Sequence, residues 1–178
     1  LYVRVRFQKN NVLITCKFIY NVILAAKNAA QSFVSHLKET MKTTYEIRYA
    51  AHPDDAKHYD TKRIRQEFLI ERIFAEDEVN LVYSMYDRMI VGGAMPVGEV
   101  LRLEAIDPIK ADFFTARREI GLFNVGGKGS VKVGNEVFEL DFKEALYIGR
   151  GDRDVMFMSE KPDHPAKFYF NSVTANKE

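Results

Sequence analysis

Short runs of β-prone residues separated by glycines constrain the fold of this chain more than any other feature of its sequence. Runs this short and this closely spaced are typical of antiparallel sandwiches and barrels rather than of parallel sheets joined by helices. The glycine-rich loop at residues 126–129 lacks the spacing of a phosphate-binding loop and is interpreted as a hairpin connection. The chain is therefore expected to be mainly β. The runs lie within residues 117–155, at 121–125, 130–133, 137–140 and 145–148.

Flanking segments are expected to add one short helix and several strands. The helix is predicted from Thr61, a potential N-cap, to about Leu69, because Ile64 and Phe68 lie four residues apart. Gly92-Gly93 indicates a bulge or the close approach of another segment. Strands are expected at residues 45–49, 70–74, 79–86, 89–95, 97–103, 154–158 and 167–173, with Asp87-Arg88 as a candidate tight turn.

The distribution of charge divides the chain at Met41. Residues 1–40 contain six basic residues and one acidic residue, a net of +5, which leaves 20 basic and 24 acidic residues, a net of −4, in residues 41–178. The balanced total predicts no nucleic-acid partner. A single cysteine, Cys16, excludes an internal disulfide framework and favours a reducing compartment such as the cytoplasm. One domain of ordinary size is expected from Met41 on.

Residues 1–40 are interpreted as an extension that is not part of the fold. Their longest mostly apolar run, residues 18–26, is far shorter than the roughly 20 residues that span a bilayer, so no membrane partner is predicted. The basic start and short apolar centre resemble a signal peptide, and the lack of acidic residues before Glu39 resembles a transit peptide. Both patterns fit poorly, because Lys17 and Lys27 interrupt the apolar part of this segment instead of flanking it. Two readings stay open: upstream sequence with Met41 as the natural start, or a targeting segment.

Six segments between about Tyr45 and about Asn171 match a known family in order and without large gaps. They are residues 65–69, 86–96, 117–121, 124–127, 145–149 and 165–169. On these residues the chain resembles the amino-terminal half of the 5-dehydro-4-deoxy-D-glucuronate isomerases, which are cupin ketol-isomerases of pectin breakdown. The resemblance implies a cupin-type antiparallel β-barrel or jelly-roll sandwich with a short helix near its start.

The same resemblance implies a reaction and its requirements. The family converts 5-dehydro-4-deoxy-D-glucuronate into 3-deoxy-D-glycero-2,5-hexodiulosonate, which moves a proton between adjacent carbons through an enediolate. It also implies a homo-oligomer, a hexamer, and a zinc site whose three histidines and one glutamate lie in the carboxy-terminal half. This chain would then be a scaffold and oligomer interface, inactive alone. Two alternatives are a metal-free cupin that binds a sugar acid or serves as an oligomerisation module, and a split enzyme with a separate catalytic half.

No metal ligand is predicted in this chain. Glu119 and Gly126 keep the glutamate–glycine spacing of metal-binding cupins, but the histidines of that pattern are missing. Carboxylates beside phenylalanine are poor ligands for zinc, which prefers imidazole and thiolate. The histidine positions fall on Asp112 and Phe114, or on Phe113 and Thr115, and later on Asp154, while His36, His52, His58 and His164 are interpreted as surface residues.

Five charged residues are candidates for contact with an anionic substrate: Arg117, Arg118, Glu119, Asp87 and Arg88. An arginine can hold a carboxylate through a bidentate, charge-assisted hydrogen bond. Neighbouring strand residues point to opposite faces, so at most one of Arg117 and Arg118 is expected to face the interior. The alternative is that the arginines pair with Glu119 or with acids of a partner subunit, and Asp87-Arg88 carries the same ambiguity.

Overall fold

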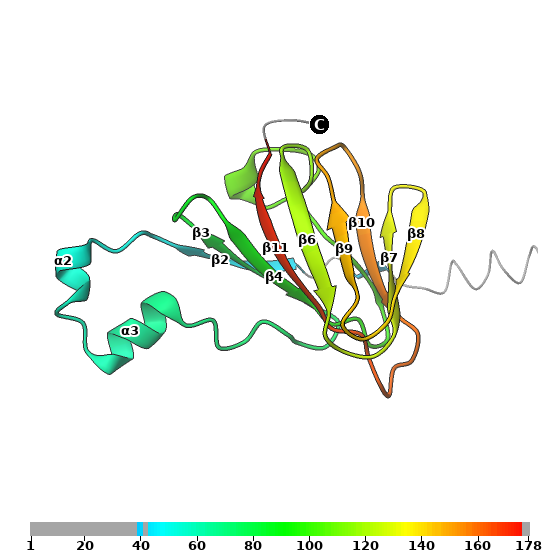
Figure 1. Cartoon of the computed structure of the whole chain (residues 1–178), viewed down its shortest axis with the longest axis horizontal. Helices are drawn as coiled ribbons and strands as arrows, with labels where there is room; N and C mark the ends of the chain where they lie inside the picture. The colour runs from blue at the N-terminus through cyan, green and yellow to red at the C-terminus, as the bar shows by residue number, and fades with distance from the viewer. Residues whose placement is uncertain (1–38, 41–42, 176–178) are drawn as a thin grey trace, which may run out of the picture. The chain divides into compact units, whose positions relative to one another are not determined.

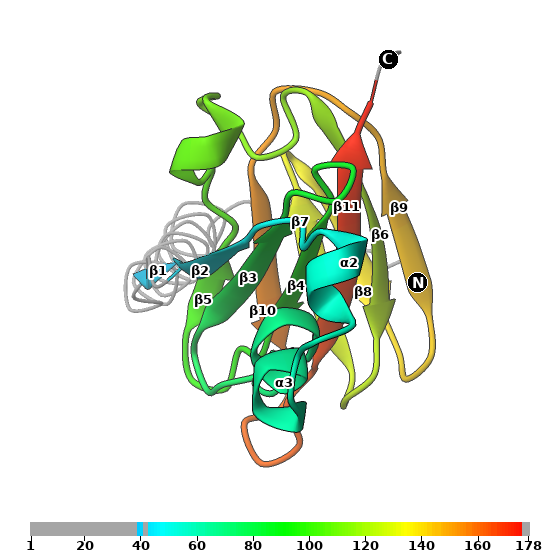
Figure 2. The same ribbon diagram turned by 90° about the vertical axis from the view of Figure 1, so that its left-hand side faces the viewer.

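Two β-sheets hold most of the residues that the computed structural model describes, which are 39–40 and 43–175. The five-stranded sheet has the order β1-β5-β10-β7-β8, and the six-stranded sheet has the order β2-β3-β4-β11-β6-β9 (Figures 1 and 2). Only β1–β5 and β2–β3 are parallel among the described strand pairs. The strands are β1 (Glu39–Thr40), β2 (Thr43–Arg48), β3 (Val79–Ser84), β4 (Ile90–Ala94), β5 (Val100–Arg102), β6 (Arg118–Asn124), β7 (Gly129–Val133), β8 (Glu136–Leu140), β9 (Ala145–Ile148), β10 (Val155–Ser159) and β11 (Phe168–Thr174).

The two-sheet, mainly β architecture confirms the expected fold class. Each of the four glycine-bounded runs forms a strand, β6 to β9, and buried residues alternate with less buried ones along β6 and β7 as the alternation of apolar residues predicts. The described fold begins at Glu39, two residues before the expected start at Met41. Residues 1–38 lie outside the described residues, so the interpretation of that extension stays a prediction.

Two local predictions are wrong. Residues 70–74 form no strand, because they cross the outer face of the six-stranded sheet instead of joining it. A Cβ atom on Gly93 would lie 2.5 Å from the backbone oxygen of Ile73, which explains why this position of β4 carries glycine. Helix α3 (Thr61–Phe68) is capped by Asp60, whose Oδ1 accepts from the Arg63 N–H at 2.7 Å, rather than by Thr61.

The core between the sheets is built around aromatic rings. Phe157 of β10 stacks on Phe168 and Phe170 of β11, with ring centroids 5.5 Å and 5.9 Å apart. Phe114 meets the edge of Phe170 at 6.4 Å. These rings are buried together with the inward-facing aliphatic residues of both sheets. Because protein interiors pack at the density of organic crystals, this core holds side chains where a ligand cavity would otherwise lie.

Helices α2 (Pro53–Ala56) and α3 belong to an arm, residues 49–74, that connects β2 to the segment before β3. The arm stands in front of the outer face of the six-stranded sheet, as Figures 1 and 2 show. No residue of α3 is buried, and the exposed apolar side chains of the arm include Tyr49, Ile64, Phe68 and Leu69. The remaining helix is a single 3₁₀ turn, η1 (Asp107–Ile109). None of the helices in the described ranges has the length and apolarity needed to cross a bilayer.

Candidate functional site

Among residues 39–40 and 43–175, the interior of the sandwich shows no cluster of metal-ligand side chains. Phe114 occupies one of the positions that a metal-binding cupin gives to histidine, and its ring is part of the packed core. Asp154 binds Arg102 instead, with 3.1 Å between Oδ1 and Nε. Within the described ranges no three His, Cys, Asp or Glu side chains gather where they could hold a metal ion. The donor set therefore does not fit zinc, which needs three or four converging ligands.

Arg118 is buried, with 3% of its surface exposed, and its guanidinium joins three parts of the fold. Nε donates to Ser172 Oγ at 3.1 Å, and Nη2 donates to the carbonyl oxygens of Ser172 at 2.8 Å and of Arg88 at 2.6 Å. Burial lowers the pKa of Arg118 from its ordinary value; the charge of Tyr83 acts to raise it, and the charge of Arg88 lowers it further. Arg118 therefore ties β6 and β11 to the β3–β4 turn.

Asp87 and Arg88 form that turn. Both have φ of 53°, in the left-handed region that two-residue hairpin turns require, which confirms the predicted tight turn. Their side chains are exposed, whereas the carbonyl oxygen of Arg88 accepts from Arg118. The structure thus brings Arg88 and Arg118 together through the backbone of the turn.

Arg117 lies in the turn that precedes β6 and is exposed, whereas Arg118, the first residue of β6, is buried, so only one of the two arginines faces the interior. Arg117 lines a surface hollow of about 470 Å³ together with Lys110, Arg150, Asp112 and Asp152. Guanidinium groups at a surface can reach a carboxylate that approaches from outside, which the buried Arg118 cannot do without local movement. Of the two arginines, Arg117 is therefore the better placed to contact an anionic ligand. Its substrate contact stays a prediction.

Glu119 lies on the outer face of the six-stranded sheet. Its Oε2 accepts from the hydroxyl of Tyr147 on β9 at 2.8 Å. That hydrogen bond, followed by partial burial and the charge of Glu119, raises the pKa of Tyr147 from its ordinary value. The exposed apolar residues nearest in register are Phe123 and Val173, on β6 and β11. This face therefore carries exposed apolar side chains beside the Glu119–Tyr147 pair.

Replacing Glu119 with alanine is expected to lower the pKa of Tyr147 toward the ordinary tyrosine value, because the acceptor and its charge are both removed. A pH titration followed by the NMR signal of the tyrosine ring carbons measures this. Since the folded-state pKa is raised, the contribution of the pair to stability should be present below pH 10 and be lost as the pH rises through the folded-state value. Tyr45, whose pKa is raised by burial and by Asp107, serves as the control. A pKa of Tyr147 that did not change would contradict the pairing.

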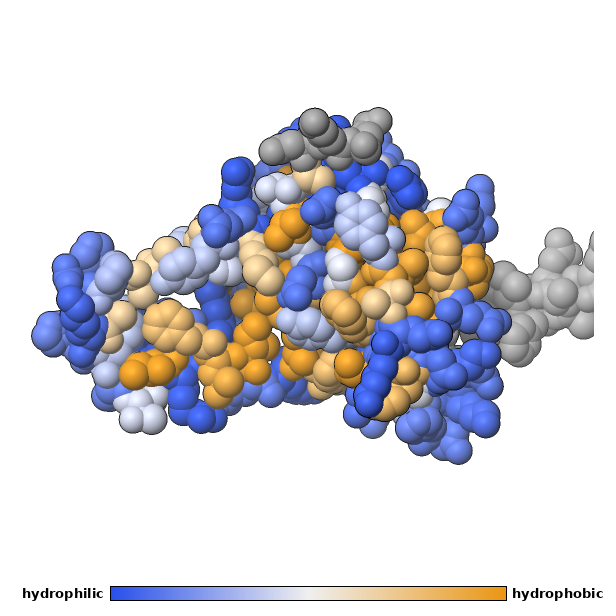
Figure 3. Space-filling view, in the orientation of Figure 1, coloured by the Kyte–Doolittle hydropathy of each residue, from blue (hydrophilic) through white to orange (hydrophobic). Residues whose placement is uncertain are grey.

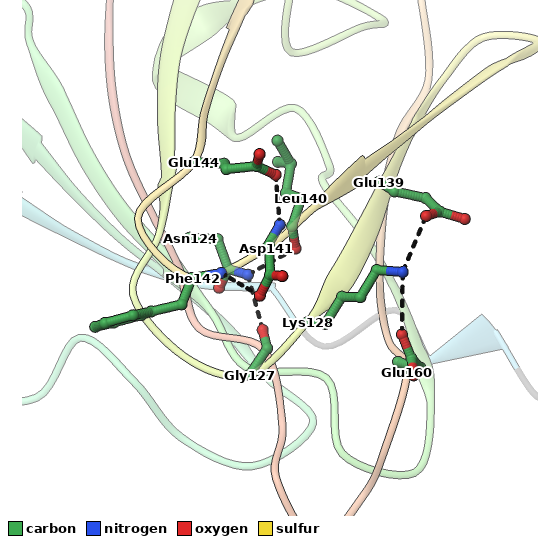
Figure 4. A network of polar contacts seen from close by, with 9 residues as sticks. All are labelled: Asn124, Gly127, Lys128, Glu139, Leu140, Asp141, Phe142, Glu144 and Glu160. Atoms are coloured by element: carbon green, nitrogen blue, oxygen red, sulfur yellow. Dashed lines mark hydrogen bonds and ion pairs between the residues drawn. The ribbon is translucent and has the colours of Figure 1, made fainter.

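The glycine-rich loop joins β6 of the six-stranded sheet to β7 of the five-stranded sheet (Figure 4). Because these two strands do not pair with each other, its interpretation as a hairpin connection is wrong, and the loop is a crossing between the sheets. Asn124 holds it: Nδ2 donates to the carbonyl oxygens of Gly127 and Leu140 at 2.7 Å and 3.0 Å. Lys128 lies between Glu139 and Glu160, with Nζ–O distances of 3.0 Å and 3.4 Å. Hydrogen bonds to both glutamates and their charges raise the pKa of Lys128. The lysine is thus already paired and is not presented to a phosphate.

A further pocket lies beside the arm. It has a volume of about 540 Å³ and lies between α3, the segment that follows α3, the edge strand β2 and its neighbour β3. Sequence reasoning missed it because its walls come from segments that share no local pattern. One signal was available, since residues 65–69 are among the segments that match the known family and three of these residues, Arg65, Gln66 and Leu69, line the pocket.

Comparison with known proteins gives a consistent set of relatives. No family model matches the chain. A "4-deoxy-L-threo-5-hexosulose-uronate ketol-isomerase" of Bacteroides fragilis is 69% identical over 137 residues, which are 77% of this chain and 49% of that protein. The "4-deoxy-L-threo-5-hexosulose-uronate ketol-isomerase 1" of Bacteroides thetaiotaomicron is 71% identical over the same shares, and the Formosa agariphila protein is 50% identical over 76% of this chain and 49% of its own length. The chain spans about half the length of the curated relatives it matches.

Among solved structures, a cupin protein from Bacteroides fragilis aligns with a TM-score of 0.38 and 19% identity, over 51% of this chain and 69% of its own. The cupin domain of Schizosaccharomyces pombe Cnp3 aligns with a TM-score of 0.37 and 15% identity, over 49% of this chain and 52% of that chain.

Proposed function

Because this chain belongs to the family of the 4-deoxy-L-threo-5-hexosulose-uronate ketol-isomerases, we propose that it is one part of an enzyme that converts 5-dehydro-4-deoxy-D-glucuronate into 3-deoxy-D-glycero-2,5-hexodiulosonate. The observation that carries the proposal is the identity of 69–71% over 137 residues. The proposed setting is the breakdown of pectin-type uronates in the cytoplasm. The fold alone would not support this function, because a β-sandwich hosts many unrelated activities.

In this proposal the described domain supplies structure and contacts, and the chemistry takes place on residues outside it. The packed aromatic interior and the scattered metal-ligand types support this division. A zinc ion would be held by three histidines and one glutamate in the part of the relatives that this chain does not match. No step of the reaction is assigned to a metal in this domain. Of the candidate residues, Arg117 would contribute a guanidinium to the substrate carboxylate. Arg118 would hold the turn formed by Asp87 and Arg88.

A homo-oligomer, with six copies expected, is the proposed assembly. Exposed aromatic and aliphatic side chains on the outer face of the six-stranded sheet support it, because such groups are enriched at the centres of protein interfaces. They are Phe123, Tyr147 and Val173. The pairing of Glu119 with Tyr147 would reduce the cost of burying that carboxylate when a second copy covers this face.

The test is turnover of 5-dehydro-4-deoxy-D-glucuronate by two purified proteins: this chain, and the same chain extended by coding sequence to the length of its relatives. The extended protein should convert the substrate. The chain alone should retain less than about one thousandth of that rate, because loss of a catalytic metal site removes several kcal/mol of transition-state stabilisation. Product is measured by NMR. An inactive extended protein, or an equally active chain alone, would overturn the proposal. Recovery of turnover on mixing separate halves would identify a split enzyme.

A further inference from the structure

The pocket in the arm has the features of a ligand site. It lies between the arm and the sheet. Figure 3 shows that the arm is separated from the rest of the domain along part of its length. Its volume of about 540 Å³ falls within the range of roughly 300–1,000 Å³ that is typical of small-molecule sites. Arg48 on β2 fixes one wall, because Nη2 donates to the Leu69 carbonyl oxygen at 2.7 Å and so holds the C-terminal end of α3. The pocket is therefore part of the folded arm and not only a gap between loops.

Asn80, which lines this pocket, has a buried polar atom without a partner. Asn80 of β3 accepts a hydrogen bond at Oδ1 from Thr44 Oγ1 at 2.6 Å, which orients its amide. The amide nitrogen Nδ2 is buried and has no hydrogen-bond partner in the described structure. A buried donor left unpaired costs about 1–3 kcal/mol, so native proteins seldom keep one. A ligand that accepts from Asn80 Nδ2 would remove this cost.

The charges that line the pocket favour an anion. Four basic residues and two acidic residues line it, and both acids already have partners. Glu46 pairs with Arg48 at 3.0 Å, and Glu71 pairs with Arg65 at 2.6 Å. The described residues provide no carboxylate partner for the other two basic side chains, Lys62 and Arg72. These two cations are free to contact the carboxylate of a ligand.

Hydroxyl and apolar groups complete the lining. Thr44 brings a hydroxyl oxygen that can still accept a hydrogen bond, since its proton is donated to Asn80 Oδ1. The Tyr45 hydroxyl donates to Asp107 Oδ2 at 3.2 Å, outside this lining, while Leu69, Ile70 and Val82 bring apolar surface. An inorganic anion would use the cations and leave the apolar surface uncovered. A small molecule that carries one carboxylate, several hydroxyls and a carbon skeleton would use all three kinds of group.

We propose that this pocket binds a sugar acid, with Lys62 and Arg72 contacting its carboxylate and Asn80 Nδ2 donating to one of its hydroxyls. The preference for an anion with hydroxyls rests on the pocket, and the choice of a uronate as that anion rests on the proposed function. Occupation would also join α3 to β2 and β3 and so stabilise the arm.

Isothermal titration calorimetry of the full chain with D-galacturonate tests the proposal. Galacturonate should bind at low salt, and D-glucose and inorganic phosphate should bind at least about tenfold more weakly, because each lacks part of the matched chemistry. The double variant Lys62→Gln with Arg72→Gln should weaken galacturonate binding at least about tenfold, and Asn80→Leu about fivefold, which corresponds to one lost hydrogen bond. The control Lys132→Gln with Lys161→Gln removes the same charge outside the pocket and should bind as the unchanged chain does. Thermal melts verify that each variant folds.

Three results would overturn the proposal: equal binding of glucose, full displacement by phosphate, or unchanged binding in the Lys62 and Arg72 variant. None of them depends on turnover, so failure of the pocket and failure of the proposed function can be told apart. An extended protein that isomerises its substrate while this pocket binds no galacturonate would refute the pocket alone. If the extended protein bound galacturonate in this pocket but did not convert the substrate, only the proposed activity would be refuted.

Discussion

Replacing Phe157 with alanine is expected to lower the free energy of unfolding by about 4 kcal/mol, the middle of the range for large aromatic side chains removed from a core. Phe157 is fully buried and stacks on two other rings, so its removal leaves a cavity that the two sheets cannot close. Urea unfolding followed by circular dichroism measures the change, provided that the dependence on urea is similar in both proteins. The effect is large compared with the stability of an ordinary domain, so the variant is best studied at low temperature.

Phe142 provides the matched control for Phe157. It is exposed, and its replacement with alanine should change the free energy of unfolding by no more than about 0.5 kcal/mol. Phe157→Leu keeps most of the apolar volume and should cost about 1–2 kcal/mol. A loss below about 1 kcal/mol for Phe157→Ala would contradict the packed interior. It would also reopen the possibility that the sandwich encloses a ligand.

Replacing Arg118 with methionine is expected to cost about 3 kcal/mol of unfolding free energy. Methionine fills a similar volume but leaves the carbonyl oxygens of Arg88 and Ser172 without their donor, at about 1–3 kcal/mol for each buried group. Relief from burying the cation offsets part of this cost. Equilibrium unfolding in urea gives the value, and exchange of amide hydrogens in β11 should accelerate if the tie to β6 is lost.

The adjacent residue offers the control for this prediction. Arg117→Met makes the same chemical change at an exposed position and should alter the free energy of unfolding by about 0.5 kcal/mol or less. In the extended protein, the variant with the larger effect on catalysis should be the one with the smaller effect on stability. Arg117→Met should raise the KM for the uronate, while Arg118→Met should leave the KM unchanged in molecules that remain folded. Equal losses of stability in both variants would contradict the assignment of Arg118 as a structural tie.

The local sequence pattern correctly predicted most of the strands and which of their residues face the core. The valines of β7 are buried at alternate positions because successive strand residues point to opposite faces. Arg118 at the start of β6 is buried and Arg117 before it is exposed, as expected for at most one inward-facing arginine. The turn at Asp87-Arg88 and the close approach at Gly93 were also predicted from residue type. In each case the cause is local backbone geometry, which the neighbouring residues of the chain specify.

Local pattern failed where a segment looked like a strand but had no strand beside it. Residues 70–74 are rich in β-prone side chains, yet they cross the sheet face above Gly93. The partner of a strand is another segment, so only the fold decides whether an apolar run joins a sheet or covers it. The N-cap of α3 is Asp60, one residue before the predicted Thr61. Both residue types are good N-caps, so residue type alone did not distinguish them.

The sequence by itself determined that this chain builds a two-sheet β fold and, through six matching segments, which family it resembles. Only the tertiary structure showed that Phe114 belongs to the packed core, that Arg118 is a structural tie, and that Lys62, Arg72 and Asn80 share a pocket. The physical reason is that the spacing of apolar residues along the chain indicates which face of a helix or strand is buried. A binding site, in contrast, forms where segments far apart in the sequence come into contact. Such contacts depend on long-range packing, which no single segment of the sequence specifies.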